Sequence, residues 1–262
     1  ATVGVHPENC ADVGDDYLDE LIVDLNKVIE DLGGIEMLTN DFISNVSHEL
    51  KTPLAAMQNY ALLLQAPDLD EIQRVEYASA ISERCRRLTS LVTNILKLNK
   101  LENQHIFPKG APYDVGEEVR NSVLSFEEAW SKKNIDIEAD IADGILVTFA
   151  PEMLGLVWNN LLSNAIKFTP PGGTIQVTLR EEIEPCRAIL MCVKDSGCGM
   201  DEKTRSRVFE KFFQGDTSHA RSGNGLGLAL ASRAAYICGG EITVESQVGC
   251  GSTFTVRIPL EK

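Results

Sequence analysis

The chain has 262 residues, of which 44% are hydrophobic and 24% are charged, and its formal net charge is -15. This length allows two domains of ordinary size, and the composition is typical of a globular protein without low-complexity tracts. The negative charge argues against a nucleic acid partner, because a phosphate backbone would be repelled. No apolar run approaches the roughly 20 residues that a membrane-spanning helix needs.

The seven cysteines and four histidines show no C-x-x-C pair and no spacing typical of a zinc site. We therefore expect reduced thiols in a cytosolic protein, several of them buried as small hydrophobic side chains. No metal site made of Cys or His is expected.

The opening segment, residues 1–40, contains a helical pattern around Gly14–Leu21 and Leu25. This pattern is similar to the second helix of a HAMP signal-relay module, of which only half would be present. An ordinary N-terminal helix extension is the alternative, because helical periodicity fits both. If the resemblance holds, the chain is the cytoplasmic portion of a membrane-anchored receptor, connected to the membrane only through a segment upstream of the sequence.

Two helices are predicted between residues 41 and 104, separated by a turn at residues 66–70. Pro67 breaks the first helix, and either Asp68 or Asp70 can cap the second. Both helices carry apolar residues three and four positions apart. Because this stripe is too long for one partner to cover, we expect two hairpins to pair as a four-helix bundle in a homodimer. The stripe consists of Ile43, Val46, Leu50, Leu54, Met57, Ala61 and Leu64, then Ala78, Ile81, Cys85, Leu88, Val92 and Ile95.

A linker with two prolines and a glycine, residues 107–112, separates this hairpin from a region of mixed periodicity. The pattern predicts helices over 114–133 and 151–168, the latter opened by Pro151 at its first position. Alternating apolar residues predict strands at 135–141, 174–180, 188–194, 241–246 and 253–258. Helices on one face of a mixed sheet, an α/β sandwich, are the expected arrangement.

The segment SHELKTPL, residues 47–54, places a histidine on the polar side of the first helix. His48 lies roughly 160° from the centre of the apolar stripe, so its imidazole should face solvent. An exposed imidazole can act as a nucleophile when a carboxylate such as Glu49 orients or deprotonates its other nitrogen. Thr52 lies one turn further along the same face. Taken alone, a surface histidine without function is the simpler interpretation.

The segment NNLLSNAIKF, residues 159–168, combines amides with a cation and an aromatic ring. Asn160 and Asn164 are four apart and share one helix face, where their oxygens suit a magnesium ion. Lys167 offers a charge to a phosphate group and Phe168 a ring to a base. A solvated helix face would give the same pattern without any ligand.

Two glycine-rich segments follow, DSGCGM at residues 195–200 and GNGLGL at 223–228. In the first, Gly197 and Gly199 allow close backbone approach, and Asp195 can accept a hydrogen bond from an adenine amino group. The second opens a predicted helix, whose N-terminal amides can bind phosphate. An ordinary strand-to-loop turn fits the first segment equally well, and a lone glycine-rich turn is weak evidence.

Between the glycine segments lies VFEKFFQ, residues 208–214, followed by a polar tract at 215–222. The tract fits a flexible lid over a triphosphate, and an ordinary surface loop is the alternative.

The order of these five segments is more informative than any one of them. They resemble the H-box, N-box, first glycine box, F-box and second glycine box of histidine kinases, in the family's sequence and spacing between Asp41 and Phe254. The chain is therefore identified as a member of this family. The resemblance implies an α helical hairpin, forming a four-helix bundle as a dimer, followed by an α/β sandwich of the Bergerat (GHKL) type. It implies three parts, namely 1–40, a phosphotransfer domain at 41–104 and an ATP-binding domain at 108–262.

The resemblance also implies an activity. ATP would phosphorylate His48, with Glu49 as the base or orienting group, and the phosphoryl group would pass to an aspartate of a response regulator. Thr52 resembles the residue that places a water for the reverse phosphatase reaction.

The family pattern assigns the nucleotide site residue by residue. Magnesium would be held by Asn160 and Asn164, and adenine would lie at Asp195 and Thr253 with Phe168 along the base. The remaining ATP-binding residues are Lys167, Gly197, Gly199, Lys211, Phe212, Gly223, Asn224, Gly225, Leu226, Gly227 and Leu228.

Two other functions remain open at this point. A GHKL ATPase whose product is motion, similar to gyrase or the large heat-shock chaperones, would show no label on the protein. A degenerate kinase that only scaffolds a regulator would not bind nucleotide. The intact segment at 47–54 argues against the first, and Asn160, Asp195 and the glycines argue against the second.

Overall fold

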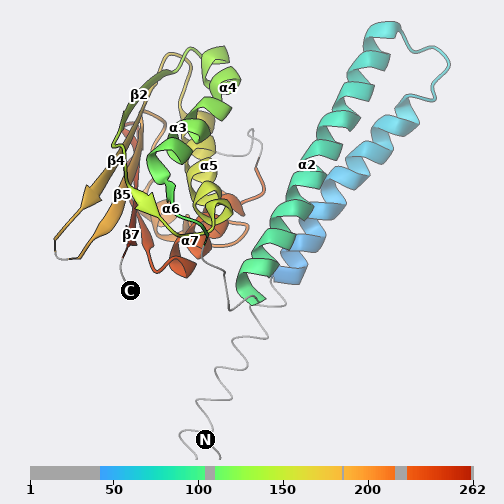
Figure 1. Ribbon diagram of the computed structural model, residues 1–262. Coiled ribbons are helices and arrows are strands. Elements are labelled where there is room, and N and C mark those ends of the chain that lie inside the picture. Colours follow the sequence, from blue (N-terminus) through green and yellow to red (C-terminus); the bar gives the residue numbers. More distant parts are fainter. Residues whose placement is uncertain (1–41, 104–109, 185, 216–222, 261–262) are drawn as a thin grey trace, which may run out of the picture. The chain divides into compact units, whose positions relative to one another are not determined.

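The structure is a computed structural model that describes residues 42–103, 110–184, 186–215 and 223–260 (Figure 1). These residues divide into two compact units between Gln58 and Asn59, and each unit is described by itself. The HAMP-like segment and nearly all of the expected lid lie outside the described residues.

The helical hairpin expected from the sequence is confirmed. A first helix covers residues 42–63, and α2 covers Glu71–Asn103. The last turn of the first helix contacts α2, because the ring centroids of Tyr60 and Tyr77 are 5.7 Å apart. The guanidinium group of Arg84 lies 5.6 Å from the centroid of the Tyr60 ring, as in a cation–π pair. Aromatic contacts therefore hold the closed end of the hairpin.

The start of α2 is fixed by a reciprocal cap. The backbone N–H of Gln73 donates to the Asp70 carboxylate at 2.7 Å, and the backbone N–H of Asp70 donates to Gln73 Oε1 at 3.4 Å. This arrangement satisfies two amides that a helix N-terminus otherwise leaves unpaired. Of the two aspartates expected as caps, Asp70 is the one that forms it.

Within the described ranges, no helix combines the length and the apolarity needed to cross a membrane.

Several large apolar side chains of the hairpin are exposed within one chain. The apolar side chains that remain exposed along the two helices are Ile43, Leu54, Leu62, Leu63, Ile72, Val75, Val92 and Leu96.

The second unit also contains a five-stranded sheet with the order β2-β4-β5-β7-β6. The pair β2·β4 is parallel and the other three pairs are antiparallel. A second, two-stranded sheet pairs β1 (Tyr113–Asp114) with β3 (Leu146–Val147). The strands of the main sheet are β2 (Asp136–Ile141), β4 (Thr174–Glu182), β5 (Ala188–Asp195), β6 (Glu241–Gln247) and β7 (Gly251–Pro259).

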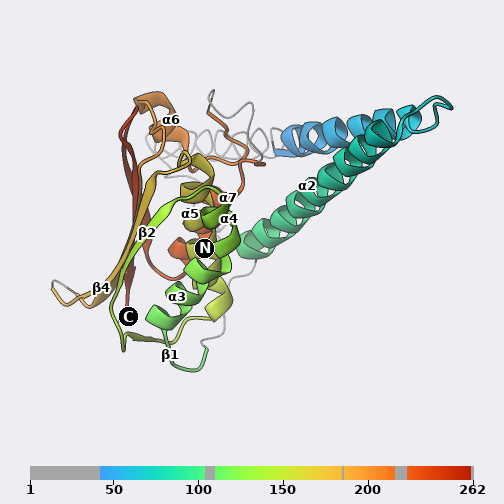
Figure 2. The same cartoon turned by 90° about the horizontal axis from the view of Figure 1, so that it is seen from above.

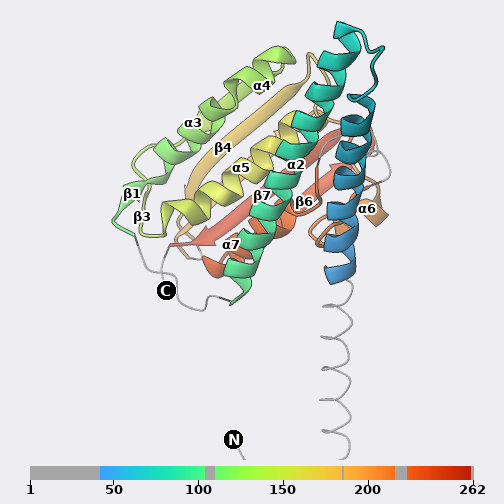
Figure 3. The same cartoon turned by 90° about the vertical axis from the view of Figure 1, so that its right-hand side faces the viewer.

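Helices cover one face of this sheet, as Figures 2 and 3 show. The layer contains α3, α5 and α7, and α5 contacts the other two. The helices of this unit after α2 are α3 (Val115–Ser125), α4 (Glu127–Lys132), α5 (Pro151–Phe168), α6 (Glu202–Arg207) and α7 (Gly227–Ile237).

Alternation along the strands explains the layering. In β4, Ile175, Val177 and Leu179 are fully buried and the residues between them are not, so alternate side chains meet the helices. On the facing side, α5 buries Trp158 and Leu161 completely. The expected α/β sandwich is confirmed.

One predicted helix is two helices in the structure. The segment 114–133 is divided at Phe126, whose φ of -101° and ψ of 10° end α3 and precede α4. The N–H of Phe126 donates to the carbonyl of Val123 at 3.1 Å, three residues back, as in a terminal turn. The helix expected from the second glycine segment begins only at Gly227.

Candidate functional site

His48 is exposed, as its position on the first helix predicts. The side chain is 79% accessible, and its Nδ1 lies 3.8 Å from Oε1 of Glu49. This distance is longer than a hydrogen bond. The pair therefore provides an accessible imidazole with a carboxylate beside one of its nitrogens.

Thr52 lies one turn beyond His48, and its hydroxyl is engaged with the helix. Its Oγ1 donates to the carbonyl of His48 at 3.1 Å. Such back-bonding is common for threonine in helices. The oxygen still has lone pairs that can accept from a water molecule.

Asn160 presents its amide oxygen to the second glycine segment. Its Nδ2 donates to the carbonyl of Leu156 at 2.7 Å, which sets the orientation of the amide. A Cβ on Gly227 would lie 2.6 Å from Asn160 Oδ1. The atom that can bind a metal ion therefore faces the first residue of α7.

The second glycine segment follows the surface of α5. At its start, a Cβ on Gly223 would lie 2.7 Å from Lys167 Nζ, and at its end Gly227 meets Asn160. These two partners are seven residues apart on α5, a rise of about 10 Å. Asn164 lies between them in sequence and is half-buried. The residues expected to bind magnesium and phosphate are thus brought together along one helix.

The middle of the second glycine segment contacts Phe212. The N–H of Phe212 donates to the carbonyl of Gly225 at 2.9 Å. Gly225 has a φ of +65°, and a Cβ there would lie 2.6 Å from the carbonyl carbon of Phe212, so glycine is required. The other partner of this contact, Phe212, also adopts a positive φ of 63°. The F-box and the second glycine box are therefore in direct backbone contact.

The remaining residues of these two segments have structural partners. Asn224 Oδ1 accepts from the N–H of Leu226 at 3.2 Å, and the side chain of Leu226 is fully buried in the core. Leu228 is half-buried, and the exposed Lys211 forms an ion pair with Glu102 at 2.5 Å. Leu226, which was expected to bind ATP, therefore packs in the core.

Asp195 is buried at the end of β5, with 5% of its surface exposed. Its Oδ1 accepts from the N–H of Gly197 at 2.8 Å and from the N–H of Ser252 at 3.3 Å. Burial raises the pKa of this carboxyl group above its ordinary value. Within the described residues no hydrogen bond ends on Oδ2, so this oxygen can accept from an amino group of a ligand.

Ser252, which was not among the expected site residues, is the residue of β7 that contacts Asp195, and Thr253 is not. In the register of β5 and β7, Ser252 is opposite Asp195 and Thr253 is opposite Lys194. Successive side chains of a strand point to opposite faces, so Thr253 lies on the other face of the sheet from Asp195. The sequence held a signal of this arrangement. Ser252 is two residues before the buried Phe254, so the two side chains point to the same face of the strand.

The first glycine segment is packed between α5 and a hairpin turn. A Cβ on Gly197 would lie 2.6 Å from Asp195 Oδ1 and 2.9 Å from the carbonyl oxygen of Phe168. Gly199 has a φ of +65°, and a Cβ there would collide with the carbonyl oxygen of Gln247. Gly199 is therefore explained by packing against the turn between β6 and β7.

Lys133 is a residue that the sequence did not single out. Its Nζ donates to the carbonyls of Ile166 at 2.6 Å, Lys167 at 3.0 Å and Thr169 at 3.0 Å. A cation at this position satisfies free carbonyls and opposes the negative end of the helix dipole. Beside it, Lys167 Nζ lies 4.6 Å from the centroid of the Phe168 ring. Lys133 therefore fixes the end of α5 that carries two expected ligand contacts.

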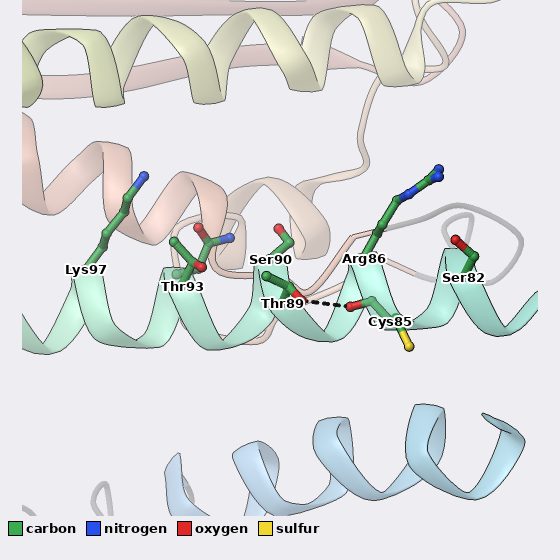
Figure 4. Close-up of a pocket in the computed structure, with 8 residues that line it drawn as sticks. Ser82, Cys85, Arg86, Thr89, Ser90, Thr93 and Lys97 are labelled. Carbon is green, nitrogen blue, oxygen red and sulfur yellow. Dashed lines mark hydrogen bonds between the residues drawn. The ribbon is translucent and has the colours of Figure 1, made fainter. Parts of the chain in front are cut away.

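A hollow of about 550 Å³ lies along α2 and shares no residue with these groups. Figure 4 shows Arg86 and Lys97 rising from one side of the helix and the sulfur of Cys85 pointing to the other. Thr89 Oγ1 donates to the carbonyl of Cys85 at 3.0 Å. Because every lining residue comes from one helix, the hollow has no second wall that could enclose a ligand.

Comparison with known proteins gives matches to both parts of the chain. Residues 38–104 match the family described as His Kinase A (phospho-acceptor) domain. Residues 150–262 match the family described as Histidine kinase-, DNA gyrase B-, and HSP90-like ATPase.

Among individual proteins, the sensor-like histidine kinase SenX3 of Mycobacterium tuberculosis is 33% identical over 233 residues, which are 87% of this chain and 56% of SenX3. The circadian input-output histidine kinase CikA of Synechococcus elongatus is 37% identical over 227 residues, 84% of this chain and 30% of CikA. The crystal structure of full-length ShkA in complex with AMPPNP is similar with a TM-score of 0.61 and 28% identity, over 85% of this chain and 46% of ShkA. The chain thus spans less than two thirds of each of these proteins.

Proposed function

Because the chain belongs to the histidine kinase family, we propose that it is an ATP-dependent kinase that phosphorylates its own His48 and passes the phosphoryl group to an aspartate of a response regulator. The observation that carries this proposal is the set of contacts around α5. Both glycine segments meet that helix at the residues expected to bind ATP, namely Asn160, Lys167 and Phe168. An exposed histidine with a neighbouring carboxylate supplies the phosphate acceptor.

The parts of the chain have separate tasks in this proposal. Residues 41–104 form the phosphotransfer domain, residues 108–262 bind ATP, and residues 1–40 are half of a HAMP module. The exposed apolar side chains of the hairpin support a homodimer, in which a second copy covers them. The chain is then the cytoplasmic portion of a membrane-anchored receptor.

ATP binds along α5 and the two glycine segments. Asp195 Oδ2 accepts from the adenine amino group while Oδ1 stays bonded to the backbone, and the ring of Phe168 lies along the base. Lys167 and the free amides at the N-terminus of α7 contact the phosphates.

The residues present fit a magnesium ion. Asn160 Oδ1 faces the start of α7, and Asn164 is one turn further along the same helix, so both amides lie on one face of α5 and offer the hard oxygen ligands that magnesium prefers. When bound, magnesium neutralises charge on the triphosphate.

The reaction at His48 is an in-line displacement. With Glu49 accepting from Nδ1–H, the other nitrogen, Nε2, keeps its lone pair and attacks the γ-phosphorus. A nitrogen–phosphorus bond forms as the bond from phosphorus to the bridging oxygen of ADP breaks. Glu49 stabilises the positive charge that the imidazole acquires.

The partner in the second step is the receiver domain of a response regulator. Its aspartate takes the phosphoryl group from His48. In the reverse, phosphatase direction, Thr52 Oγ1 would accept from a water aimed at the phosphoaspartate while still donating to the carbonyl of His48.

Incubation with ATP labelled at the γ-phosphate tests the proposal. We expect label on the protein that is lost in acid and kept in alkali, and its absence from a His48→Gln variant that binds ATP normally. Lys51→Gln, which changes an exposed residue of the same helix, is the matched control and should label like the native chain. Phosphate release without label would favour a motor ATPase, and no nucleotide binding would favour a scaffold.

A further inference from the structure

Two exposed cysteines lie on segments that contact each other beside Asp195. Cys198 belongs to the first glycine segment, and Cys250 belongs to the turn between β6 and β7. The N–H of Gly249, the residue directly before Cys250, donates to the carbonyl of Cys198 at 2.8 Å. The main chains that carry the two thiols are therefore in direct contact.

The residue after Cys198 contacts both ends of the turn that contains Cys250. A Cβ on Gly199 would collide with the carbonyl oxygen of Gln247 and would lie 3.1 Å from that of Gly251. The N–H of Cys250 donates to the same carbonyl of Gln247 at 3.0 Å, which closes the turn. Cys250 thus lies between Gln247 and Gly251, and both of these residues contact Gly199, the residue after Cys198.

Each cysteine also stands between two glycines. Residues 197–199 read GCG, and residues 249–251 read GCG again. Glycine changes its backbone angles at the lowest cost of any residue, so both segments can adjust toward the distance and dihedral angle that a disulfide needs. A pair of exposed thiols on adjoining, adjustable backbones is suited to reversible bond formation.

We propose that Cys198 and Cys250 form a redox modification site, closed as an intrachain disulfide by a peroxide or by a small disulfide. With hydrogen peroxide, one thiolate attacks an oxygen atom and becomes a sulfenic acid as the O–O bond breaks, and the hydroxide that leaves takes up the thiol's proton as the first water. The second thiolate attacks the sulfenic sulfur, so that the S–S bond forms, the S–O bond breaks and a second water leaves. Two electrons pass from the sulfurs to the peroxide. With a small disulfide, one thiolate attacks a disulfide sulfur and releases the first small thiol, and the second thiolate then attacks the mixed disulfide and releases the second; a thiol reductant reverses either change.

The effect on ATP follows from the partners of Asp195, and this step rests on the proposed function. Gly197, which donates to Oδ1 at 2.8 Å, is adjacent to Cys198, and Ser252, which donates at 3.3 Å, is two residues from Cys250. Drawing the two sulfurs together shifts both donors and thereby displaces the carboxylate. Oxidation should weaken ATP binding.

Peptide mapping of the full chain tests the bond without reference to activity. The chain is treated with hydrogen peroxide or glutathione disulfide, its free thiols are alkylated, and it is cleaved after Lys, Arg and Glu. Cleavage after Glu245 separates Cys250 from the buried Cys238. We expect Asp195–Glu202 linked to Ser246–Arg257, with a mass two hydrogens below the sum. The linked product should be absent from Cys198→Ser and Cys250→Ser and present in Cys186→Ser, another exposed cysteine.

Titration with a fluorescent ATP analogue measures the consequence. The oxidised native chain should bind about three- to tenfold more weakly than the reduced chain, with recovery in dithiothreitol and no change in Cys250→Ser. Absence of the linked peptide, or a link between two chains, overturns the proposal. A linked peptide with unaltered affinity refutes the effect on ATP and supports the bond alone. A reduced native chain that binds no nucleotide contradicts the proposed function, while the peptide map still decides the disulfide.

Discussion

Replacing Lys133 with methionine tests whether its ammonium group positions the end of α5. The change removes three hydrogen bonds, of 2.6, 3.0 and 3.0 Å, from carbonyls that then lack these donors. One hydrogen bond to a charged group contributes about 1.5–3 kcal/mol, and a partly buried cation at a helix C-terminus contributes up to about 2 kcal/mol. Both figures describe the same ammonium group, so we expect a loss of about 2–3 kcal/mol in the free energy of unfolding rather than their sum.

Thermal unfolding and nucleotide titration measure the two expected effects. For a domain of about 150 residues, that loss corresponds to a fall in Tm of roughly 5–10 °C. The carbonyl groups that Lys133 contacts belong to the turn that carries Lys167 and Phe168. The KM of the Lys133→Met variant for ATP should therefore also rise, with a smaller change in kcat.

Two further variants serve as controls. Lys132→Met changes the neighbouring exposed lysine and should leave both quantities unaltered. Lys133→Arg keeps the charge and should restore part of the affinity. An unchanged Tm and KM in Lys133→Met would refute the role of the ammonium group, and a lower Tm with an unchanged KM would limit Lys133 to stability.

Other groups of the chain give three more expectations. Burial raises the pKa of Glu118 from 4.5 to about 7, although Tyr113 donates to it at 3.0 Å, so the folded state holds this proton more tightly than the unfolded state. The free energy of unfolding should therefore fall by about 1–2 kcal/mol as the pH rises from below 4.5 through 7. In urea titrations, Glu118→Gln should remove this fall. An equal dependence of the free energy of unfolding on pH in the variant would contradict the expectation. Asn160→Ala should lower nucleotide affinity with magnesium but not in a chelator, and equal losses in both would exclude a metal role. Thr52→Ala should keep phosphorylation and transfer but slow the loss of phosphate from the regulator in the presence of ADP; equal decay would leave Thr52 only its bond to His48.

The elements with strong periodicity could be predicted from the sequence. The bounds of α5, Pro151–Phe168, agree with the prediction because proline opens the helix and the apolar pattern stops at its end. Two-residue strands such as β1 have no period to detect, so the second sheet was missed. The break at Phe126 was also missed, because the residues on both sides of it are helix formers.

The sequence indicates which kinds of residue form the candidate site better than it indicates which residues contact one another. Asn160 and Asp195 lie beside the glycine segments in the structure, and their role in ATP binding stays a prediction. Lys133 and the end of α5 that it contacts are more than thirty residues apart in the sequence. A lysine after a helix such as α4 gives no sequence signal of this contact. That Ser252 rather than Thr253 is opposite Asp195 follows from the register of β5 and β7, which the sequence motif alone does not give.

Along α5, the two glycine segments contact residues that we propose to bind ATP. Gly197 touches the carbonyl of Phe168, Gly223 adjoins Lys167, and Gly227 adjoins Asn160. A Cβ on Gly197 would meet the backbone of Phe168, so packing alone disfavours a side chain there, whereas a Cβ on Gly223 or Gly227 would meet only the side chain of Lys167 or Asn160. An alanine at one of these positions would displace the residue beside it and weaken ATP binding even if the glycine never touched the nucleotide. Because of this, loss of binding in such a variant identifies a ligand contact only if its unfolding without nucleotide is unchanged.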